Sequence, residues 1–222
     1  MTANEGSFLD ALEPRELAWL EERGVRRRFE REARLFREHE PSDRVMLLMS
    51  GRVKIAGTGG DGRESVLAFR GPGEVLGELS AIDGGPRSAS VTAVDPIEAI
   101  VIPAADFRRF LETSPRATLW LLTRVIARLR ESDRKRVEFG ASDTIGRVAA
   151  RLVELAQRYG LPVEQGVRID LPITQEELAS WVGSSREGVN KALHTLRDLR
   201  WVETERRSIT VRDMDALRAR GT

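Results

Sequence analysis

The sequence predicts an α+β protein with three successive parts: a β-rich N-terminal domain, one long helix, and a C-terminal domain of short helices with a β-hairpin. Two observations support this order. From Val25 to Pro103 short apolar runs alternate with glycine, proline and aspartate, whereas from Pro115 onward apolar residues recur at helical spacing. The 222 residues suffice for two modest domains. We therefore expect domains at residues 1–114 and 141–222, joined by a helix and hinge at residues 115–140.

Short strands dominate the predicted N-terminal domain. A helix over residues 8–22, interrupted at Pro14, comes first, and a small amphipathic helix over residues 104–112 closes the domain. Between them the glycine-rich segments at residues 57–62 and 71–73 are typical of tight turns. Many short strands with regular turn signals favour a β-roll or jelly roll. The strand-like runs are residues 45–49, 53–56, 65–69 and 91–94.

The long helix is expected to begin at Pro115 and to run to about residue 139. Leu119, Leu122, Ile126 and Leu129 follow the 3-4-3 spacing of a coiled-coil seam. A two-stranded seam of this kind indicates a homodimer. The alternative is a helix whose apolar face packs on its own β domain.

The C-terminal domain has the pattern of a DNA-binding module. A helix over residues 144–159 and a strand over residues 167–171 precede two helices, at residues 174–181 and 185–199, which are joined by a tight turn. A hairpin around Arg206 and Arg207 follows. A helix-turn-helix with a hairpin behind it is a winged helix, which binds double-stranded DNA.

The start of the second helix carries the expected base contacts. Arg186 suits a two-point contact to guanine, and Glu187 suits the amino group of cytosine. Alternatively, Glu187 closes a capping box with Ser184 and has only a structural role. The other expected DNA contacts lie at helix starts or one turn further on, at Thr174, Gln175, Ser185, Asn190 and Lys191.

A glycine-rich stretch at residues 77–90 predicts a ligand site. Arg87 offers a guanidinium fork that matches a phosphate, and glycines let backbone N–H groups approach an anion. The carboxylate of Glu78 suits hydroxyl donors such as a sugar diol, and Ser80 and Ser88 add hydroxyls. The stretch is therefore expected to bind a molecule with a phosphate at one end and hydroxyls at the other.

Composition excludes several classes of protein. The chain has no cysteine, which excludes disulfides, thiolate-held metals and iron–sulfur clusters. Its two histidines lie far apart in sequence, so we expect neither a metal site nor haem. No apolar run could span a membrane and no signal peptide is evident, which favours a cytoplasmic protein. No nucleophile, general base or metal cluster is positioned for catalysis, so an enzyme is not expected.

Three motifs resemble the bacterial family of the catabolite activator protein and the fumarate–nitrate regulator. They are Gly71-Pro72-Gly73-Glu74 leading to Gly77-Glu78-Leu79, then Pro86-Arg87-Ser88-Ala89, then residues 183–191. The resemblance implies a cyclic-nucleotide-binding β-roll, a dimerisation helix and a winged helix. It implies a homodimeric transcription regulator on a palindromic, TGTGA-like operator, with RNA polymerase as a further partner.

The resemblance also implies ligand roles for particular residues. Glu78 corresponds to the carboxylate that binds the ribose, and Arg87 and Ser88 correspond to the ligands of the cyclic phosphate. The serine after Arg87 favours cAMP over cGMP. The remaining implied site residues are Gly77, Leu79, Ser80 and Ala89 around the pocket, and Arg128, Ser132 and Asp133 on the long helix.

Asp133 departs from the family pattern, which has a serine that contacts adenine at this position. The departure keeps two alternatives open. One is the same DNA-binding regulator acting without a cyclic nucleotide or with another ligand. The other, from a different class, is a cyclic-nucleotide-binding module that regulates a partner enzyme.

Overall fold

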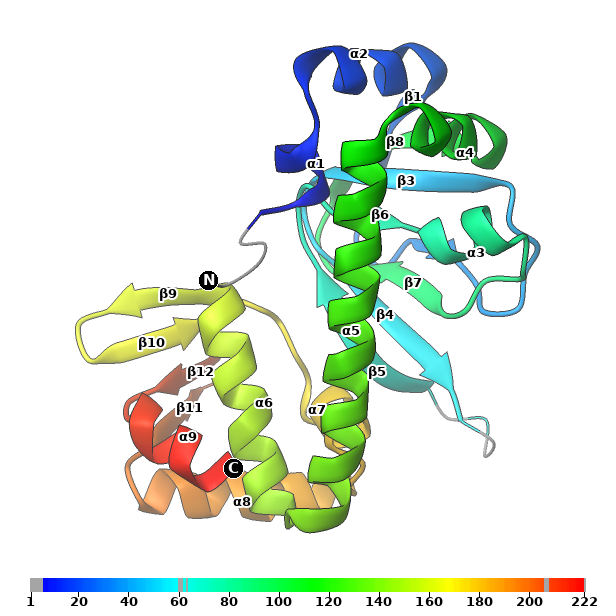
Figure 1. Cartoon of the computed structure of the whole chain (residues 1–222). Coiled ribbons are helices and arrows are strands. Elements are labelled where there is room, and N and C mark those ends of the chain that lie inside the picture. The colour runs from blue at the N-terminus through cyan, green and yellow to red at the C-terminus, as the bar shows by residue number, and fades with distance from the viewer. Residues whose placement is uncertain (1–5, 60–61, 63, 206–207, 222) are drawn as a thin grey trace. The chain divides into compact units, whose positions relative to one another are not determined.

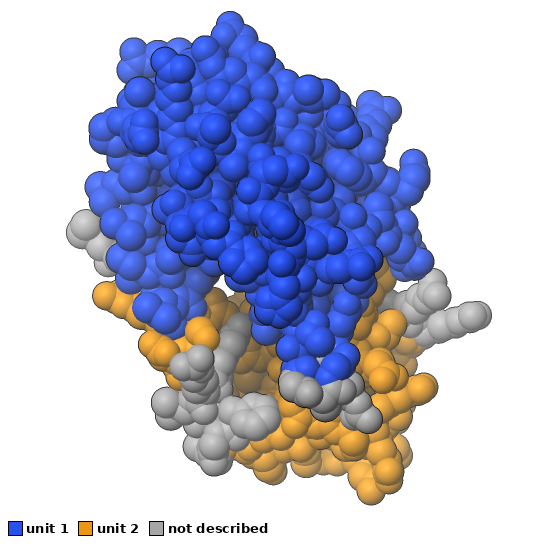
Figure 2. All heavy atoms as spheres, turned by 90° about the vertical axis from the view of Figure 1, so that its right-hand side faces the viewer, with its two compact units in different colours: residues 1–129 blue, residues 130–222 orange. Residues whose placement is uncertain are grey.

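A computed structural model of the chain describes residues 6–59, 62, 64–205 and 208–221, with the backbone alone for residues 135–141. It divides into two compact units, residues 1–129 and residues 130–222, which Figure 2 colours blue and orange. The division falls within helix α5 (Pro115–Ala141), which spans the whole of the segment at residues 115–140 that was predicted to be a helix and hinge.

The first unit opens with two short helices, α1 (Phe8–Ala11) and α2 (Pro14–Arg23), where the sequence predicted an interrupted helix. Pro14 disfavours helical geometry in the residue before it, and Glu13 is accordingly extended and caps α2. At the start of α1 the side chain of Ser7 accepts a hydrogen bond from the backbone N–H of Asp10.

Two antiparallel four-stranded sheets follow, which confirms the predicted β-roll (Figure 1). Because alternate residues of a strand face opposite sides, Met46 and Leu48 of one sheet pack between the two sheets against Phe36 and Val53 of the other. The first sheet has the order β1 (Val25–Phe29), β8 (Ile97–Pro103), β3 (Arg44–Ser50), β6 (Val75–Leu76). The second has the order β2 (Arg34–Phe36), β7 (Ser90–Ala93), β4 (Val53–Thr58), β5 (Glu64–Arg70).

Helices cover the outer face of the first sheet. Val45 and Leu47 of β3 point to this side, where they pack with Phe107 and Phe110 of α4 (Ala104–Thr113) and with Phe8 of α1. The short helix α3 (Glu78–Asp83) begins the predicted ligand stretch, between β6 and β7.

Helix α5 has two apolar faces with different surroundings. Ala117 and Leu121 are buried in the core of the first unit. The predicted seam faces away from that core, and its side chains are between 41% and 64% exposed (Leu119, Leu122, Ile126 and Leu129). These four side chains are therefore not buried in the core of the first unit, and their contact with a second copy of the helix stays a prediction.

The second unit contains the predicted winged helix-turn-helix. Its helices bury one apolar face each, with Leu152, Leu178 and Leu193 almost fully covered. The helices are α6 (Thr144–Tyr159), α7 (Gln175–Val182), α8 (Arg186–Asp198) and α9 (Met214–Gly221). One antiparallel sheet joins β11 (Val202–Glu205), β12 (Ser208–Val211), β10 (Gly166–Ile169) and β9 (Gly160–Val163) in that order.

Three details of the second half differ from the sequence-based expectation. Gly140 lies inside α5, which ends at Ala141, so the break before α6 falls at Ser142 and Asp143. The segment of Gly160 and Pro162 was expected only to end a helix, but it forms strand β9 because it pairs with β10. Helix α9 was not predicted, and it is held to α6 by the buried side chain of Leu217 and an ion pair of Arg220 with Asp143.

Candidate functional site

The predicted ligand stretch begins at Gly77, which is the N-cap of α3 with a φ of 81°. A Cβ atom at this position would lie 2.3 Å from Nη1 of Arg87, so only glycine allows the arginine to approach. Ser80 is buried, and its hydroxyl donates to the carbonyl of Pro86 at 3.1 Å. These contacts fold the two ends of the stretch against each other.

Arg87 is almost fully buried, with 3% of its surface exposed. Its Nη1 donates to the carbonyl of Gly77 at 3.2 Å and its Nη2 to the carbonyl of Arg44 at 2.6 Å. The guanidinium also lies 3.8 Å from the centre of the Phe36 ring. Burial, and secondly the charge of Arg44, lower the pKa of Arg87 below its ordinary value. The guanidinium is therefore held rigidly beside the loop by protein groups.

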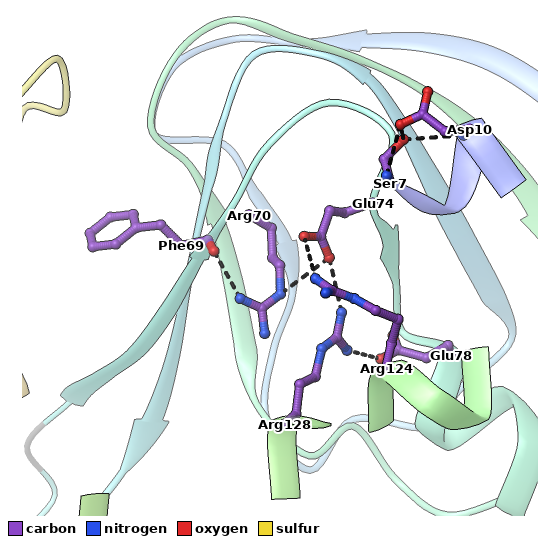
Figure 3. Close-up of polar contacts among 8 residues, drawn as sticks. All are labelled: Ser7, Asp10, Phe69, Arg70, Glu74, Glu78, Arg124 and Arg128. Carbon is purple, nitrogen blue, oxygen red and sulfur yellow. Dashed lines mark hydrogen bonds and ion pairs between the residues drawn. The ribbon is translucent and has the colours of Figure 1, made fainter. Parts of the chain in front are cut away.

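Glu78 and Arg128, which the sequence assigned to one site, are in direct contact (Figure 3). The carboxylate of Glu78 is buried, and its Oε1 accepts from Nη1 of Arg128 at 2.5 Å. Nη2 of the same arginine donates to Oε2 of Glu74 at 2.9 Å. Helix α5 is thus linked by one charge-assisted hydrogen bond to the ligand stretch, at Glu78, and by a second to Glu74 just before it.

Sequence reasoning gave no role to three residues of this cluster. Glu74 is buried just before β6, with Nε of Arg70 at 3.5 Å and Nη2 of Arg124 at 3.7 Å from its carboxylate oxygens (Figure 3). A signal was available: Glu74 and Glu78 are four residues apart, as are Arg124 and Arg128. Two acids and two bases at matching intervals indicate paired partners, although the spacing does not say which segments meet.

The other predicted ligand residues lie at the edge of this cluster or outside it. Leu79 and Ser88 are exposed, and Ala89 is half-buried. Ser132 and Asp133 are exposed on α5 in the second unit, so their contact with a base stays a prediction.

Two capping residues and one glycine determine where the helices of the helix-turn-helix begin and end. Thr174 caps α7 through a capping box with Glu177, as the sequence predicted. Gly183 ends α7 in the left-handed region with a φ of 59°, which reverses the chain toward α8. Ser185 then caps α8 by accepting from the backbone N–H of Gly188 at 3.0 Å.

The predicted base-reading residues form an exposed surface at the start of α8. Arg186, Glu187, Asn190 and Lys191 are exposed, as are Thr174, Gln175 and Ser185 at the two helix starts. The alternative role of Glu187 in a capping box with Ser184 is wrong, because Ser185 caps the helix and Glu187 lies 3.0 Å from Nζ of Lys191. The wing is the hairpin β11–β12. Arg206 and Arg207, around which the sequence predicted this hairpin, lie outside the described residues.

The described part of the chain has neither a membrane-spanning helix nor a cluster of metal ligands. No helix there is long and apolar enough to cross a membrane. No group of three or more histidine, aspartate or glutamate side chains there is arranged to hold a metal ion.

Known families and structures match both units. Residues 26–114 match the cyclic nucleotide-binding domain family, and residues 146–220 match the Crp-like helix-turn-helix domain family. The CRP-like cAMP-activated global transcriptional regulator of Mycobacterium tuberculosis is 37% identical over 192 residues, which cover 86% of each chain. The cyclic AMP receptor protein of Thermus thermophilus is 32% identical and covers 74% of this chain and 73% of its own.

A solved structure has the same fold. The c-di-GMP-responsive global regulator CLP of Xanthomonas campestris superposes with a TM-score of 0.79 at 24% identity, over 90% of this chain and 99% of its own. The described fold, the two family matches and the similarity to the mycobacterial regulator agree. The chain belongs to the CRP/FNR family of DNA-binding transcription regulators, with a cyclic-nucleotide-binding domain and a Crp-like helix-turn-helix, and it is not an enzyme.

Proposed function

We propose that this regulator is a homodimer whose binding to a palindromic operator is controlled by cyclic AMP. The observation that carries the proposal is the contact of Arg128 with Glu78. It joins the stretch that the sequence assigns to the ligand with the helix that bears the exposed seam. Ile126 and Leu129 of the seam flank Arg128 along α5, so a change at this arginine acts directly on the seam.

Cyclic AMP fits the chemistry of the ligand stretch. Arg87 and Ser88 supply donors for a cyclic phosphate, and Glu78 supplies an acceptor for a ribose hydroxyl. Ser132 and Asp133 would meet the base. The similarity to a cAMP-activated regulator at 37% identity supports the same effector here.

The exposed seam supports dimerisation. Four large apolar side chains at 3-4-3 spacing on one helix face form a stripe that a second copy of the same helix covers. To bind two TGTGA-like half-sites one turn of DNA apart, the two copies of α8 in such a dimer would lie about 34 Å from each other. A dimer bound to an operator near a promoter, in the cytoplasm, would have RNA polymerase as a further partner.

The control is a shift between two conformations of the dimer. A phosphate that binds near Arg87 attracts Arg128 and changes its pairing with Glu78 and Glu74. The seam residues beside Arg128 then adopt the pairing that presents both copies of α8 to DNA. A coupling of about 1–3 kcal/mol between the two sites suffices for regulation.

Calorimetric titration with cAMP and with cGMP tests the ligand. We expect heat of binding for cAMP and weaker binding for cGMP. Absence of heat with both nucleotides would contradict cyclic-nucleotide control. Two observations favour, as a second candidate, a regulator that uses no cyclic nucleotide: Asp133 departs from the family pattern, and Arg87 already donates to two backbone carbonyls.

Sedimentation velocity tests the dimer independently of the ligand. The unaltered chain should sediment as a dimer, whereas Leu122→Glu, which places a charge in the seam, should give a monomer. An exposed control at Leu161, substituted in the same way, should leave the dimer intact. A monomeric unaltered chain would overturn the proposal for the seam.

A further inference from the structure

Glu74 is the centre of the charged cluster between the β-roll and α5 (Figure 3). Among the described side chains, guanidiniums of three arginines lie within 4 Å of its two carboxylate oxygens: Arg128 at 2.9 Å, Arg70 at 3.5 Å and Arg124 at 3.7 Å. The side chain of Glu74 is only 9% exposed. It is therefore a buried anion with several cationic neighbours.

The backbone holds Glu74 in place on both sides. Its carbonyl accepts from the N–H of Leu48 at 3.0 Å, and its own N–H donates to the carbonyl of Gly71 at 3.3 Å. These two hydrogen bonds fix the backbone of Glu74 just before β6, and with it the position from which the side chain extends. Of its partners, Arg128 is the one that also reaches the ligand stretch, through Glu78 at 2.5 Å.

Both terminal nitrogens of Arg128 therefore donate to carboxylates of the protein itself. A phosphate beside Arg87 that recruits Arg128 competes with Glu74 for this guanidinium, because movement of the side chain toward the phosphate lengthens the hydrogen bond from Nη2 to Glu74. Glu78 can keep one hydrogen bond to Arg128 and still accept from a hydroxyl, since a carboxylate has about four lone-pair sites. Glu74 has no such second task among the groups of the proposed ligand.

We propose that Glu74 is an internal anion that competes with the ligand's phosphate for Arg128 and thereby sets the affinity for anionic ligands. The inference deepens the proposed function and rests on it for the identity of the ligand as a cyclic nucleotide. Glu74 is a positioning residue, because it acts on the ligand through Arg128 and not by contact.

Glu74→Gln is the direct test. The amide has nearly the same shape but carries no charge, so its oxygen accepts a weaker hydrogen bond from Arg128. The arginines then have a surplus of positive charge, which destabilises the ligand-free protein and favours an incoming anion. We expect the dissociation constant for cAMP to fall by about tenfold, since a charge-assisted hydrogen bond is lost only from the free state.

Melting temperatures provide a readout that needs no nucleotide. The unaltered chain, Glu74→Gln and a control, Glu64→Gln, are melted in sodium chloride and in sodium phosphate of equal ionic strength, and then with cAMP. Glu64 is exposed on β5 and pairs with Arg34 at 3.1 Å, so the control removes a charge of the same kind away from the cluster. Phosphate and cAMP should raise the melting temperature of Glu74→Gln more than that of the other two proteins.

The outcomes separate the two proposals. Equal stabilisation of all three proteins by phosphate, or weaker cAMP binding by Glu74→Gln, overturns the role of Glu74. Selective stabilisation of Glu74→Gln by phosphate, with no effect of cAMP on any protein, supports that role and contradicts cyclic AMP as the effector. If Glu74→Gln does not fold, the variant Arg124→Gln provides the test. Without Arg124, Glu74 binds Arg128 more tightly, so phosphate should stabilise this variant less than the unaltered chain. Equal or greater stabilisation by phosphate would overturn the inference.

Discussion

The charged side chains of Glu78 and Arg87 in the ligand stretch are buried, whereas those at the start of helix α8 are exposed. Arg87 and Glu78 are 3% and 5% exposed, and both already bind protein groups. Glu187 and Lys191 on α8 pair with each other while their side chains are 78% and 77% exposed. A ligand at the first site must exchange existing partners, whereas DNA at the second meets side chains that water surrounds.

Under the proposed function, this difference distinguishes a ligand site that controls conformation from a surface that contacts DNA bases. Exchange of buried partners couples ligand binding to the positions of the groups that are released, and Arg128 is such a group. Exposed side chains break few contacts with the rest of the protein when they bind, so sequence preference comes from the base edges they meet. Substitutions in the two regions should therefore affect different quantities, and the following predictions begin with the largest effect.

Arg87→Ala should destabilise the first unit by about 3 kcal/mol, because two buried carbonyls lose their donor and Phe36 loses its cationic neighbour. Denaturant unfolding measures the free energy, and calorimetry at a temperature where the variant is folded should show that binding of cAMP is almost abolished. A loss of less than about 1 kcal/mol would mean that burial of this arginine is not what maintains the loop.

Arg186→Ala should cost about 1–3 kcal/mol in binding to a half-site that contains the matching guanine. Its free energy of unfolding should change by less than about 0.5 kcal/mol, because the side chain is exposed. Fluorescence anisotropy with the native duplex and with a duplex altered at that guanine separates base reading from general attraction. Equal losses on both duplexes would reduce Arg186 to a phosphate contact.

Asp143→Ala should cost about 1 kcal/mol of stability at neutral pH, because Asp143 caps α6. The hydrogen bond from the N–H of Gly146, together with Arg220, lowers the pKa of Asp143 below its ordinary value of 3.8. Its stabilising effect is therefore complete above that value and is lost as the pH falls through the lowered pKa. The difference in unfolding free energy between the two proteins should shrink as the pH falls from neutral to strongly acidic, because protonation removes the charge of Asp143. Asp143→Asn, which keeps an acceptor for the N–H of Gly146 but has no charge, should retain part of the cap at every pH. A difference that does not shrink toward acidic pH would exclude the charge as its source.

The pair of Glu187 and Lys191 should contribute least, about 0.3–0.5 kcal/mol, as an exposed pair one helical turn apart. A double-mutant cycle with Glu187→Gln and Lys191→Met measures the coupling, which added salt should weaken. A coupling above about 1 kcal/mol would mean that α8 is ordered by its charges as well as by its buried face.

Local signals in the sequence were sufficient for most of the fold. The capping residues Asp143 and Thr174, Pro115 at a helix start, and the turn at Gly183 all act within a few residues, so the predicted helices were confirmed to within a residue or two. Strand β9 was not predicted, because its pairing with β10 outweighs the turn chemistry of Gly160 and Pro162. Helix α9 also depends on distant contacts, with Leu217 buried beneath it.

The ligand site was predictable only in part, because some of its residues meet through contacts between segments that are distant in sequence. Its glycines, Glu78 and Arg87 lie in one short stretch and form a recognisable motif. Glu74 and Arg124 gain significance from a contact across about 50 residues, and no local pattern states that these segments meet. The exposed seam on α5 was predicted from its spacing, and the structure adds that the opposite face of this helix is the one that packs on the β-roll.

The most direct test of the account is the affinity of the protein for a palindromic TGTGA-like duplex, measured by fluorescence anisotropy with and without saturating cAMP. If a ligand in the buried ligand stretch controls the exposed surface of α8, cAMP should raise the affinity for this duplex by roughly 5- to 150-fold, the range of typical allosteric coupling. Equal affinity in the presence and absence of cAMP would contradict control of DNA binding by this nucleotide.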